Sequence, residues 1–251
     1  MTGATSNIGR AIARRFAAEG AHVVVSGRDR QRGDAVVEDI GAAGGRADFV
    51  TAWLDGSAAA SRQLAADATG LLGGHIDILV NNAGIYPGPS TVDTDESTFD
   101  EVYAVNVKAP FFLTAAIAPS MAERGRGAII NIGSWIARLG IPRASLYSST
   151  KGAVETLTRA WAAEFGPAGV RVNAISPGVV RDEGADGDVP PETREAAGTM
   201  MLGTPAGRPG TPDAVAHAAV YLASDEAAFV HGTVIDVDGG RVGVAVVAAG
   251  R

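Results

Sequence analysis

The chain of 251 residues contains no cysteine. This absence excludes disulfide bonds, thiolate metal sites and cysteine nucleophiles, and it suits a reducing compartment. We therefore expect a cytoplasmic protein.

Positive charge is also scarce, with 21 Lys and Arg against 28 Asp and Glu and a formal net charge of −7. Because an acidic chain repels phosphates at long range, we expect no nucleic-acid or membrane partner and favour a small-molecule one. No apolar run approaches the roughly 20 residues of a membrane span, and the N-terminus lacks a charged-then-apolar signal pattern. The four histidines (His22, His75, His217 and His231) are scattered without metal-ligand spacing, which disfavours a metal-dependent hydrolase and predicts no metal site.

Short runs rich in β-branched residues alternate with longer Ala-rich stretches of helical period, which predicts a series of βαβ units. The expected strands cover residues 22–26, 47–51, 76–80, 128–132, 170–175 and 233–237. The clearest expected helices cover residues 8–19, 96–121, 146–165 and 212–223. Because the strands are almost continuously apolar, we predict a parallel sheet with helices on both faces, a three-layer α/β/α fold in one domain, residues 1–251.

Ligands of such sheets bind beyond the carboxyl ends of the strands, where two glycine-containing motifs lie. The stretch TGATSNIG, residues 2–9, opens the first helix, so backbone N–H groups and the positive helix end can meet a pyrophosphate. The second motif, Asn-Asn-Ala-Gly at residues 81–84, follows the expected strand 76–80. Each motif alone is also compatible with an ordinary turn.

A tyrosine and a lysine share one face of the expected helix 146–165. Tyr147 and Lys151 lie one helical turn apart. Ser134 follows the strand 128–132, and Asn106 lies in the expected helix 96–121. A lone Tyr-x-x-x-Lys pair is usually a surface pair, so its meaning depends on the other motifs.

In their order and spacing these motifs resemble those of the short-chain dehydrogenase/reductase family. The resemblance continues through Ser176-Pro177-Gly178 and Asp238-Gly239-Gly240, and it covers essentially the whole chain. It implies a Rossmann-type doubly wound sheet and an oxidoreductase that transfers a hydride between a nicotinamide cofactor and a carbonyl or secondary alcohol. It also implies a homo-oligomer, a tetramer or a dimer.

The resemblance assigns site residues position by position. It implies a catalytic tetrad of Asn106, Ser134, Tyr147 and Lys151. The cofactor-binding residues that it implies are Gly3, Thr5, Ser6, Asn7, Ile8, Gly9, Arg28, Leu54, Asn82, Ala83, Gly84, Tyr147, Lys151, Pro177, Gly178 and Val180.

The expected chemistry explains these residue types. Hydride transfer to a ketone builds negative charge on the carbonyl oxygen, which must be stabilised and protonated. We expect Tyr147 to donate the proton, Lys151 to lower the pKa of Tyr147, and Ser134 to donate a hydrogen bond to the substrate oxygen. By the resemblance, Lys151 also binds the nicotinamide ribose and Asn106 holds a water that links Lys151 to solvent. The alternative for Asn106 is an amide that bonds its own helix backbone.

Cofactor choice depends on the end of the second expected Rossmann strand. NAD-preferring relatives carry an acidic residue at the position of Gly27, and Arg28 follows it here. Because an arginine can pair with the 2′-phosphate, we expect NADP(H) to be favoured over NAD(H). The alternative for Arg28 is a solvated arginine at a charged helix start.

Four features depart from the family pattern. The strand that should precede the glycine-rich loop is missing: the start lies too far downstream, the fold lacks this strand, or another segment, such as residues 242–247, fills the gap. Asn7 occupies a glycine position, although asparagine tolerates left-handed backbone geometry. Trp53 replaces an aspartate, to stack on the adenine or to join the core. Asp182 replaces a hydroxyl residue, and its carboxylate would repel the pyrophosphate unless it swings outward.

Three further expectations concern the whole chain. Residues 182–209 form a long acidic loop with a short helix, which we expect to be a substrate lid. The apolar stripe of the helix 146–165 is expected to lie partly on a neighbouring subunit. The alternative to an enzyme is a nucleotide-binding regulatory or scaffold protein with the same fold and little turnover.

Overall fold

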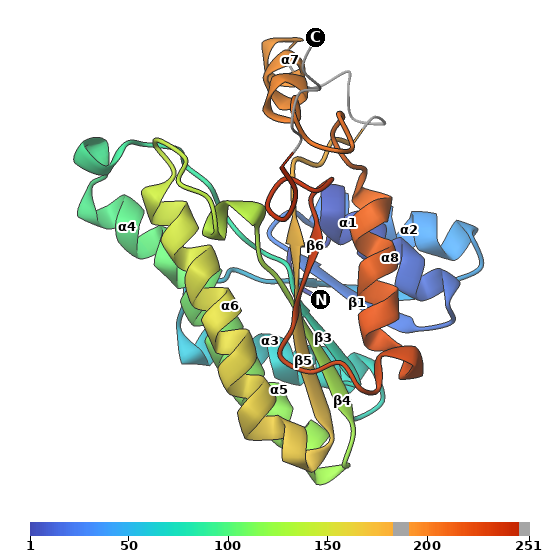
Figure 1. Cartoon of the computed structure of the whole chain (residues 1–251). Helices are drawn as coiled ribbons and strands as arrows, with labels where there is room; N and C mark the ends of the chain where they lie inside the picture. Colours follow the sequence, from blue (N-terminus) through green and yellow to red (C-terminus); the bar gives the residue numbers. More distant parts are fainter. Residues whose placement is uncertain (183–190, 246–251) are drawn as a thin grey trace, which may run out of the picture.

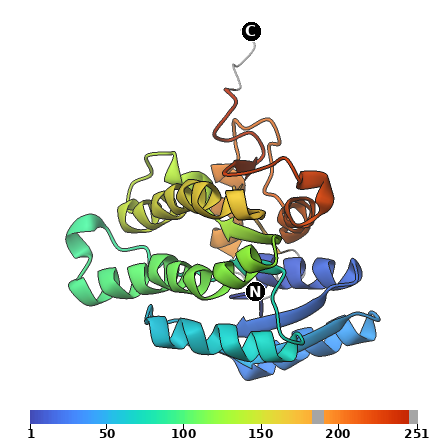
Figure 2. The same ribbon diagram turned by 90° about the horizontal axis from the view of Figure 1, so that it is seen from below.

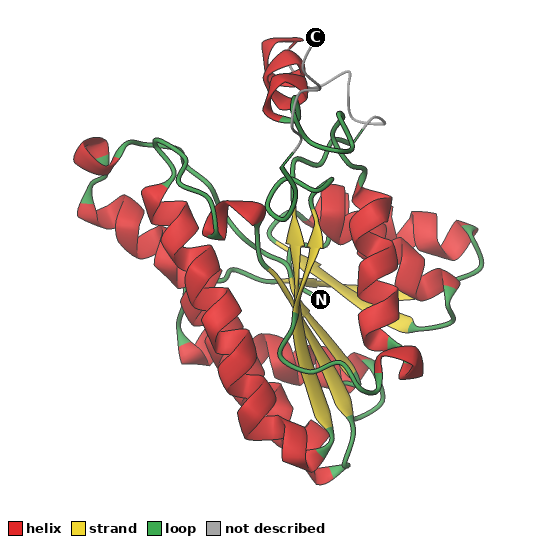
Figure 3. Cartoon of the chain, in the orientation of Figure 1, coloured by secondary structure: helices red, strands yellow, loops and turns green. Residues whose placement is uncertain are grey.

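Six parallel strands form the centre of the computed structural model, which describes residues 1–182 and 191–245 (Figures 1 and 3). The strands are β1 (His22–Gly27), β2 (Arg46–Thr51), β3 (Ile78–Asn81), β4 (Gly127–Ile132), β5 (Val170–Pro177) and β6 (Val234–Val237). β1 pairs with β2 in one sheet, and the other sheet has the order β3-β4-β5-β6. Each expected strand is confirmed, with its ends shifted by two residues at most.

Helices cover both faces of these strands, as predicted. They are α1 (Asn7–Ala18), α2 (Arg30–Ala42), α3 (Ala58–Leu71), α4 (Glu96–Tyr103), α5 (Ala109–Glu123), α6 (Ser145–Phe165), α7 (Pro191–Met200) and α8 (Pro212–Ala223). Figure 1 shows α1, α2 and α8 on one side of the strands and α3, α5 and α6 on the other. Side-chain caps begin several of them, since Asp29, Ser57 and Asp95 each accept a backbone N–H of the first turn.

The expected single helix over residues 96–121 is wrong in detail, because a π-helical segment, Ala104–Lys108, separates α4 from α5. Pro110 follows this segment and has no N–H to donate to the carbonyl of Asn106 four residues earlier. The α-helical ladder is therefore interrupted beside Asn106. Such π segments often mark functional sites.

One part of this helical stretch corrects the expectation about membrane spans. By length and composition alone, Glu96–Glu123 is apolar enough to cross a membrane, with a mean hydropathy of 1.3 in its most apolar window. Here α5 packs against α3 and the sheet, and its residues Leu113, Ile117 and Met121 are buried in the core. The core of a folded domain therefore accounts for the apolar character of α5.

The two larger hydrophobic clusters of the core lie one on each face of the strands. Ile12 and Phe16 of α1 and Leu222 of α8 belong to the first. Leu113 of α5 and Trp161 of α6 belong to the second. In the stripe of α6, Val154, Thr158 and Trp161 are buried, and Leu157 and Phe165 are half-buried against the second cluster. The expectation that part of the stripe contacts another subunit stays a prediction.

A gap separates β1 from β3, where the resemblance requires a strand. Residues 1–4 bridge it only at the carboxyl ends of β1 and β3 (Figure 2). The proposed substitute, residues 242–247, does not fill it: 242 and 243 lie in a turn, Val242 packs on the cluster of Trp135, and 246 and 247 lie outside the described residues.

Candidate active site

A cleft of about 1030 Å³ lies at the carboxyl ends of β1 and β3. Twelve of the predicted site residues line it: Gly3, Thr5, Ser6, Asn7, Ile8, Gly9, Arg28, Leu54, Asn82, Ala83, Gly84 and Tyr147. The sequence analysis missed the opposite wall, which α4 and the π segment form with Asp100, Glu101, Tyr103 and Lys108. No motif marks those positions. Asp100, Glu101 and Lys108 are exposed polar side chains like those of an ordinary helix surface, and Tyr103 is half-buried.

The glycine-rich loop forms a tight cradle at the start of α1. Gly3 has a φ of +59°, and a Cβ on Gly9 would lie 2.1 Å from the carbonyl oxygen of Gly3. Asn7 adopts the left-handed geometry expected of it, with a φ of +42°. The N-cap Ser6 makes no side-chain cap bond. The loop therefore fits a pyrophosphate, because its backbone approaches closely and no side chain caps the positive helix end.

A second set of contacts ties this loop to the end of β3. The Thr2 hydroxyl oxygen accepts the N–H groups of Asn82 and Ala83, each at 3.1 Å. The Asn82 amide donates to the carbonyls of Thr2 and Gly3 at 3.0 and 2.7 Å. Asn82 therefore holds the loop in place. The sequence predicted Asn82 as a site residue but did not predict its bonds to Thr2 and Gly3.

Tyr147 faces the cleft from the first turn of α6. Tyr86 packs on the Tyr147 ring with centroids 4.8 Å apart, and the Ser134 hydroxyl, which accepts the Ile136 N–H, lies near enough to the phenol to affect its pKa. Burial raises the pKa of Tyr147 to about 12, although the Ser134 hydroxyl acts in the opposite direction. The expectation that Lys151 lowers the pKa of Tyr147 is therefore not met in this structure, because desolvation dominates.

Lys151 lies one turn further along α6 and is buried. Its ammonium donates to the Ile132 carbonyl at 2.8 Å and lies 5.5 Å from the centroid of the Tyr147 ring. Burial lowers the pKa of Lys151 to about 8, so the group is still mostly charged at pH 7. A Cβ on Gly84 would lie 3.5 Å from Nζ, so the Asn-Asn-Ala-Gly turn leaves space beside the ammonium.

Asn106 is buried in the π segment and connects three parts of the site. Its amide oxygen accepts the Ile85 N–H at 2.8 Å, and its amide nitrogen donates to the Ile85 carbonyl and the Thr150 hydroxyl. The alternative in which Asn106 bonds its own helix is therefore wrong. The side chain fixes the loop after Gly84 against α6, next to Lys151.

Arg28 and Trp53 form the far end of the cleft. The Arg28 guanidinium lies 5.6 Å from the centroid of the Trp53 ring. Trp53 is 66% exposed, so the possibility that it joins the core is wrong. A Cβ on Gly27 would lie 2.7 Å from the Thr5 side chain, which leaves little room for a larger residue at that position.

The remaining predicted residues lie behind or beside the cleft. Pro177 ends β5, the Gly178 N–H donates to the Val237 carbonyl, and Val180 forms a parallel bridge with Gly210. Asp182 pairs with Arg10 of α1 at 2.7 Å. Its carboxylate therefore faces a cation, which would reduce the repulsion expected between this side chain and a pyrophosphate.

The expected lid is described only in part, since residues 183–190 lie outside the described residues. The expected short helix is α7, after which Met201 is buried while Leu202 is exposed. Within residues 1–182 and 191–245, the structure brings no three His, Asp or Glu side chains together in an arrangement that could hold a metal ion.

Comparison with known proteins places this site in context. Residues 3–241 match the family described as Enoyl-(Acyl carrier protein) reductase. The chain is 40% identical over 242 residues to galactitol 2-dehydrogenase (L-tagatose-forming) of Cereibacter sphaeroides, with 96% of this chain and 92% of the relative covered.

Two solved structures extend the similarity to the fold. A short chain dehydrogenase/reductase family protein is 46% identical, with a TM-score of 0.84 and 97% of this chain and 96% of the other covered. A protein of Beutenbergia cavernae, described as an NAD(P)-dependent gluconate 5-dehydrogenase with NADP bound at low occupancy, is 36% identical. Its TM-score is 0.88, and 97% of this chain and 95% of the other are covered.

Proposed function

Because this chain belongs to the short-chain dehydrogenase/reductase family and is an NAD(P)-dependent oxidoreductase, we propose that it interconverts a carbonyl compound and a secondary alcohol with Tyr147 as general acid and base. The observation that carries this proposal is the Tyr147 phenol at the wall of the cleft, close to Ser134 and with the Lys151 ammonium 5.5 Å from the centroid of its ring. Its relatives are named dehydrogenases and reductases, which supports an enzyme rather than a regulatory protein.

Tyr147 suits the reduction of a carbonyl group in particular. With its pKa raised to about 12, the phenol keeps its proton at neutral pH and can donate it to a developing oxyanion. Ser134 shares the oxyanion by hydrogen bonding and fixes its distance from Tyr147. In the oxidative direction the phenol must first lose this proton, and the Lys151 ammonium favours the resulting phenolate.

The residues of the cleft also assign the parts of a dinucleotide. The cradle of Gly3, Ser6 and Gly9 would hold the pyrophosphate, and Arg28 would hold the adenosine end. When bound, the nicotinamide supplies the hydride in reduction and accepts it in oxidation. We assign a preference for NADP(H) to Arg28, since its guanidinium can pair with the 2′-phosphate while Gly27 offers no carboxylate to a ribose hydroxyl.

Asn106 has a positioning role in this proposal. Its contacts with Ile85 and Thr150 hold the Gly84 loop and α6 together, and this arrangement keeps space beside the Lys151 ammonium. A water in that space would link the ammonium to solvent and return the proton that Tyr147 gives away.

A screen of cofactors and substrates tests the proposed activity. Carbonyl panels with NADPH and alcohol panels with NADP+ are followed through the absorbance of the reduced nicotinamide. We expect turnover of at least one class, faster with NADPH than with NADH. Tight NADPH binding without any turnover would instead favour a nucleotide-binding protein.

We also infer a homo-oligomer that forms through the helical stretch of α4 and α5 and through α6. Phe99 of α4 and Phe111 of α5 are 47% and 43% exposed, and Phe99 stacks on Tyr103 with ring centroids 4.8 Å apart. Large apolar side chains on the surface favour burial against a second copy. Light scattering at micromolar concentration should give a multiple of 25.4 kDa, and a stable mass of one chain would contradict this inference.

A further inference from the structure

The segment that leaves β4 carries Ser134 and ends in an arginine whose side chain bonds back to the sheet. Ser134 is followed by a short 3-10 helix, Trp135–Ala137, and Arg138 comes directly after it. The Arg138 side chain is only 33% exposed, because its guanidinium lies against other parts of the chain. The proposed chemistry uses Ser134 but not Arg138.

The guanidinium joins the ends of two neighbouring strands. It donates to the Ser176 hydroxyl of β5 at 2.9 Å and to both carboxylate oxygens of Asp236 of β6, one of them at 3.0 Å. Ser176 and Asp236 are register partners, so their side chains leave the same face of the sheet. Charge-assisted bonds to both oxygens of a carboxylate fix the orientation of an arginine. The guanidinium therefore holds the end of the Ser134 segment on β5 and β6.

A buried carboxylate of α6 completes this arrangement. Glu155 lies one turn after Lys151 and two turns after Tyr147, so the three side chains share one face of the helix. Its side chain is 8% exposed, and its Oε1 lies 3.7 Å from Nε of Arg138 without a hydrogen bond to any described residue. Burial raises the pKa of Glu155, and the charge of Arg138 acts in the opposite direction. We call Arg138 and its three partners the clamp: Ser176, Asp236 and Glu155.

The backbone fixes the other end of the Ser134 segment. The Gly133 N–H donates to the Ile175 carbonyl of β5 at 2.7 Å. A Cβ on Gly133 would lie 3.3 Å from that carbonyl oxygen and 3.7 Å from Oε1 of Glu155, so the segment passes close to both. Ser134 thus lies between two anchors, the Gly133 backbone and the Arg138 guanidinium. Because the second anchor also reaches α6, it relates the segment to the helix that carries the phenol.

We propose that Arg138 is a positioning residue that, through the clamp, sets the place of the Ser134 hydroxyl relative to the Tyr147 phenol. This inference rests on the proposed function, because the two side chains act as a pair only if both address one substrate oxygen. A displacement of about 1 Å in such a pair can cost on the order of a hundredfold in rate. None of the four clamp residues lines the cleft, so cofactor binding should not depend on them.

The first test compares kcat with cofactor affinity. Arg138→Met removes the charge and the hydrogen bonds but keeps an apolar stem. We expect kcat to fall by about tenfold to a hundredfold while the Kd for NADPH stays within about twofold of wild type. Arg14→Met is the control, because it removes the arginine of an ion pair with Asp39 between α1 and α2. It should change neither quantity.

A double-mutant cycle shows whether Arg138 acts through Ser134. Ser134→Ala removes the hydroxyl, so in that background the clamp has no catalytic group to place. The double variant, Ser134→Ala with Arg138→Met, should therefore have a kcat within about threefold of Ser134→Ala alone. If the two losses multiply instead, Arg138 acts independently of Ser134 and the proposal is overturned.

Hydrogen exchange tests the placement of Ser134 without a substrate. The Ile136 N–H donates to the Ser134 hydroxyl oxygen at 3.4 Å, so its exchange reports where that hydroxyl lies. In Arg138→Met we expect the Ile136 amide to exchange at least about tenfold faster, while the Ile130 amide of the central strand β4 keeps its protection. If Arg138→Met fails to fold, Asp236→Asn weakens the same clamp with a smaller change.

The outcomes separate the clamp from the proposed function. Faster exchange at Ile136 but not at Ile130, with a kcat loss that disappears in the Ser134→Ala background, supports the positioning role. Wild-type exchange at Ile136 overturns it, and so does an equal loss of protection at Ile130, because the clamp would then stabilise the whole sheet. Absence of turnover in the wild type contradicts the proposed function itself, whereas turnover that Arg138→Met leaves unchanged overturns only the clamp.

Discussion

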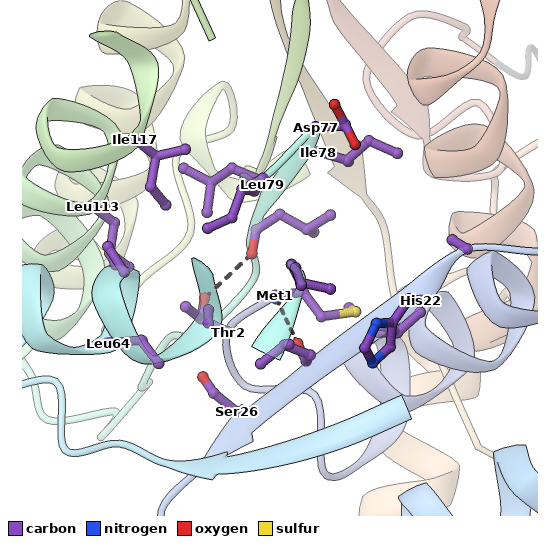
Figure 4. Close-up of a pocket in the computed structure, with 18 of the residues that line it drawn as sticks. Met1, Thr2, His22, Ser26, Leu64, Asp77, Ile78, Leu79, Leu113 and Ile117 are labelled. Carbon is purple, nitrogen blue, oxygen red and sulfur yellow. Dashed lines mark hydrogen bonds between the residues drawn. The ribbon is translucent and has the colours of Figure 1, made fainter. Parts of the chain in front are cut away.

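The two cavities on either side of residues 1–4 differ in size, polarity and completeness. The cleft at the carboxyl ends of the strands, about 1030 Å³, has a glycine-rich cradle, the Tyr147 phenol in its wall and the Arg28 guanidinium at its far end. The second cavity, which we call the slot, is about 220 Å³ and lies between β1 and β3 on the other side of residues 1–4 (Figure 4). Its walls are mostly apolar. The carboxyl ends of the strands thus form the cleft, although β1 and β3 are not paired with each other.

The contacts of residues 1–4 with the ends of β1 and β3, which form a bridge between them, explain how the cleft is held although these two strands are not paired. Thr2 binds the end of β3 through its hydroxyl oxygen, and Ala4 donates to the Ser26 carbonyl at the end of β1. These contacts hold the glycine-rich loop without a full strand beneath it. The comparison teaches that a few backbone and side-chain contacts of residues 1–4 are enough to hold the site geometry where β1 and β3 are not paired with each other.

The largest expected effect is a loss of turnover in the cleft without a change in the slot. Tyr147→Phe removes the proton donor, so we expect kcat to fall by about 10²- to 10⁴-fold while NADPH affinity and Tm stay close to wild type. Steady-state assays and NADPH titration measure both. Tyr86→Phe, at the ring that packs on Tyr147, is the matched control and should keep most of the activity. Retention of wild-type kcat in Tyr147→Phe would remove this residue from the mechanism.

The next effect concerns both cavities, because Thr2 lies between them. Thr2→Val leaves two N–H groups, those of Asn82 and Ala83, without their acceptor, and we expect a loss of about 2 to 4 kcal/mol in the free energy of unfolding. The cradle should loosen too, so NADPH affinity should fall. Denaturant unfolding and NADPH titration report the two effects. Thr156→Val, at an exposed position of α6, should change neither quantity.

The sequence predicted the strands well because a buried parallel strand carries its own signal. The apolar run at 128–132 became β4, and five of its six residues are buried. The expected helix 96–121 was less accurate, since the π segment depends on Pro110 and on the contacts of Asn106 with Ile85 and Thr150. Such tertiary contacts leave no local pattern in the sequence.

The site shows the same limit. Glycine positions and the Tyr147–Lys151 spacing are local and were found, but the direction of the pKa shift of Tyr147 depends on the burial that the folded chain imposes. The pairing of Asp182 with Arg10 joins residues far apart in the chain. The missing strand was visible in the sequence, whereas the bridge that compensates for it at the carboxyl edge was not.

A smaller effect sharpens the description of the cleft at its cationic end. Arg28→Ala should weaken NADPH relative to NADH by on the order of tenfold to a hundredfold, since a charge-assisted bond to the 2′-phosphate is worth roughly 1.5 to 3 kcal/mol. Affinities for both cofactors are measured by fluorescence titration. Arg30→Ala, at the next arginine along the chain, should leave the ratio unchanged. Equal losses for both cofactors in Arg28→Ala would show that Arg28 does not recognise the phosphate.

The smallest effect concerns the slot and is a dependence of stability on pH. Burial lowers the pKa of the Met1 amino group from 8.0 in the unfolded chain to about 6 in the folded one. Between these values the unfolded state binds more protons, so the free energy of unfolding should rise with pH from 6 to 8, by up to about 1.4 kcal/mol per pH unit. A chain acetylated at Met1 during expression provides the control, because it retains an N–H for the Val24 carbonyl but cannot be protonated at Met1. Denaturant unfolding of both forms from pH 6 to 8 should give a steeper rise for the free amine. Equal slopes would show that the Met1 ammonium is solvated, and that the bridge closes the carboxyl end of the slot less tightly than its hydrogen bonds indicate.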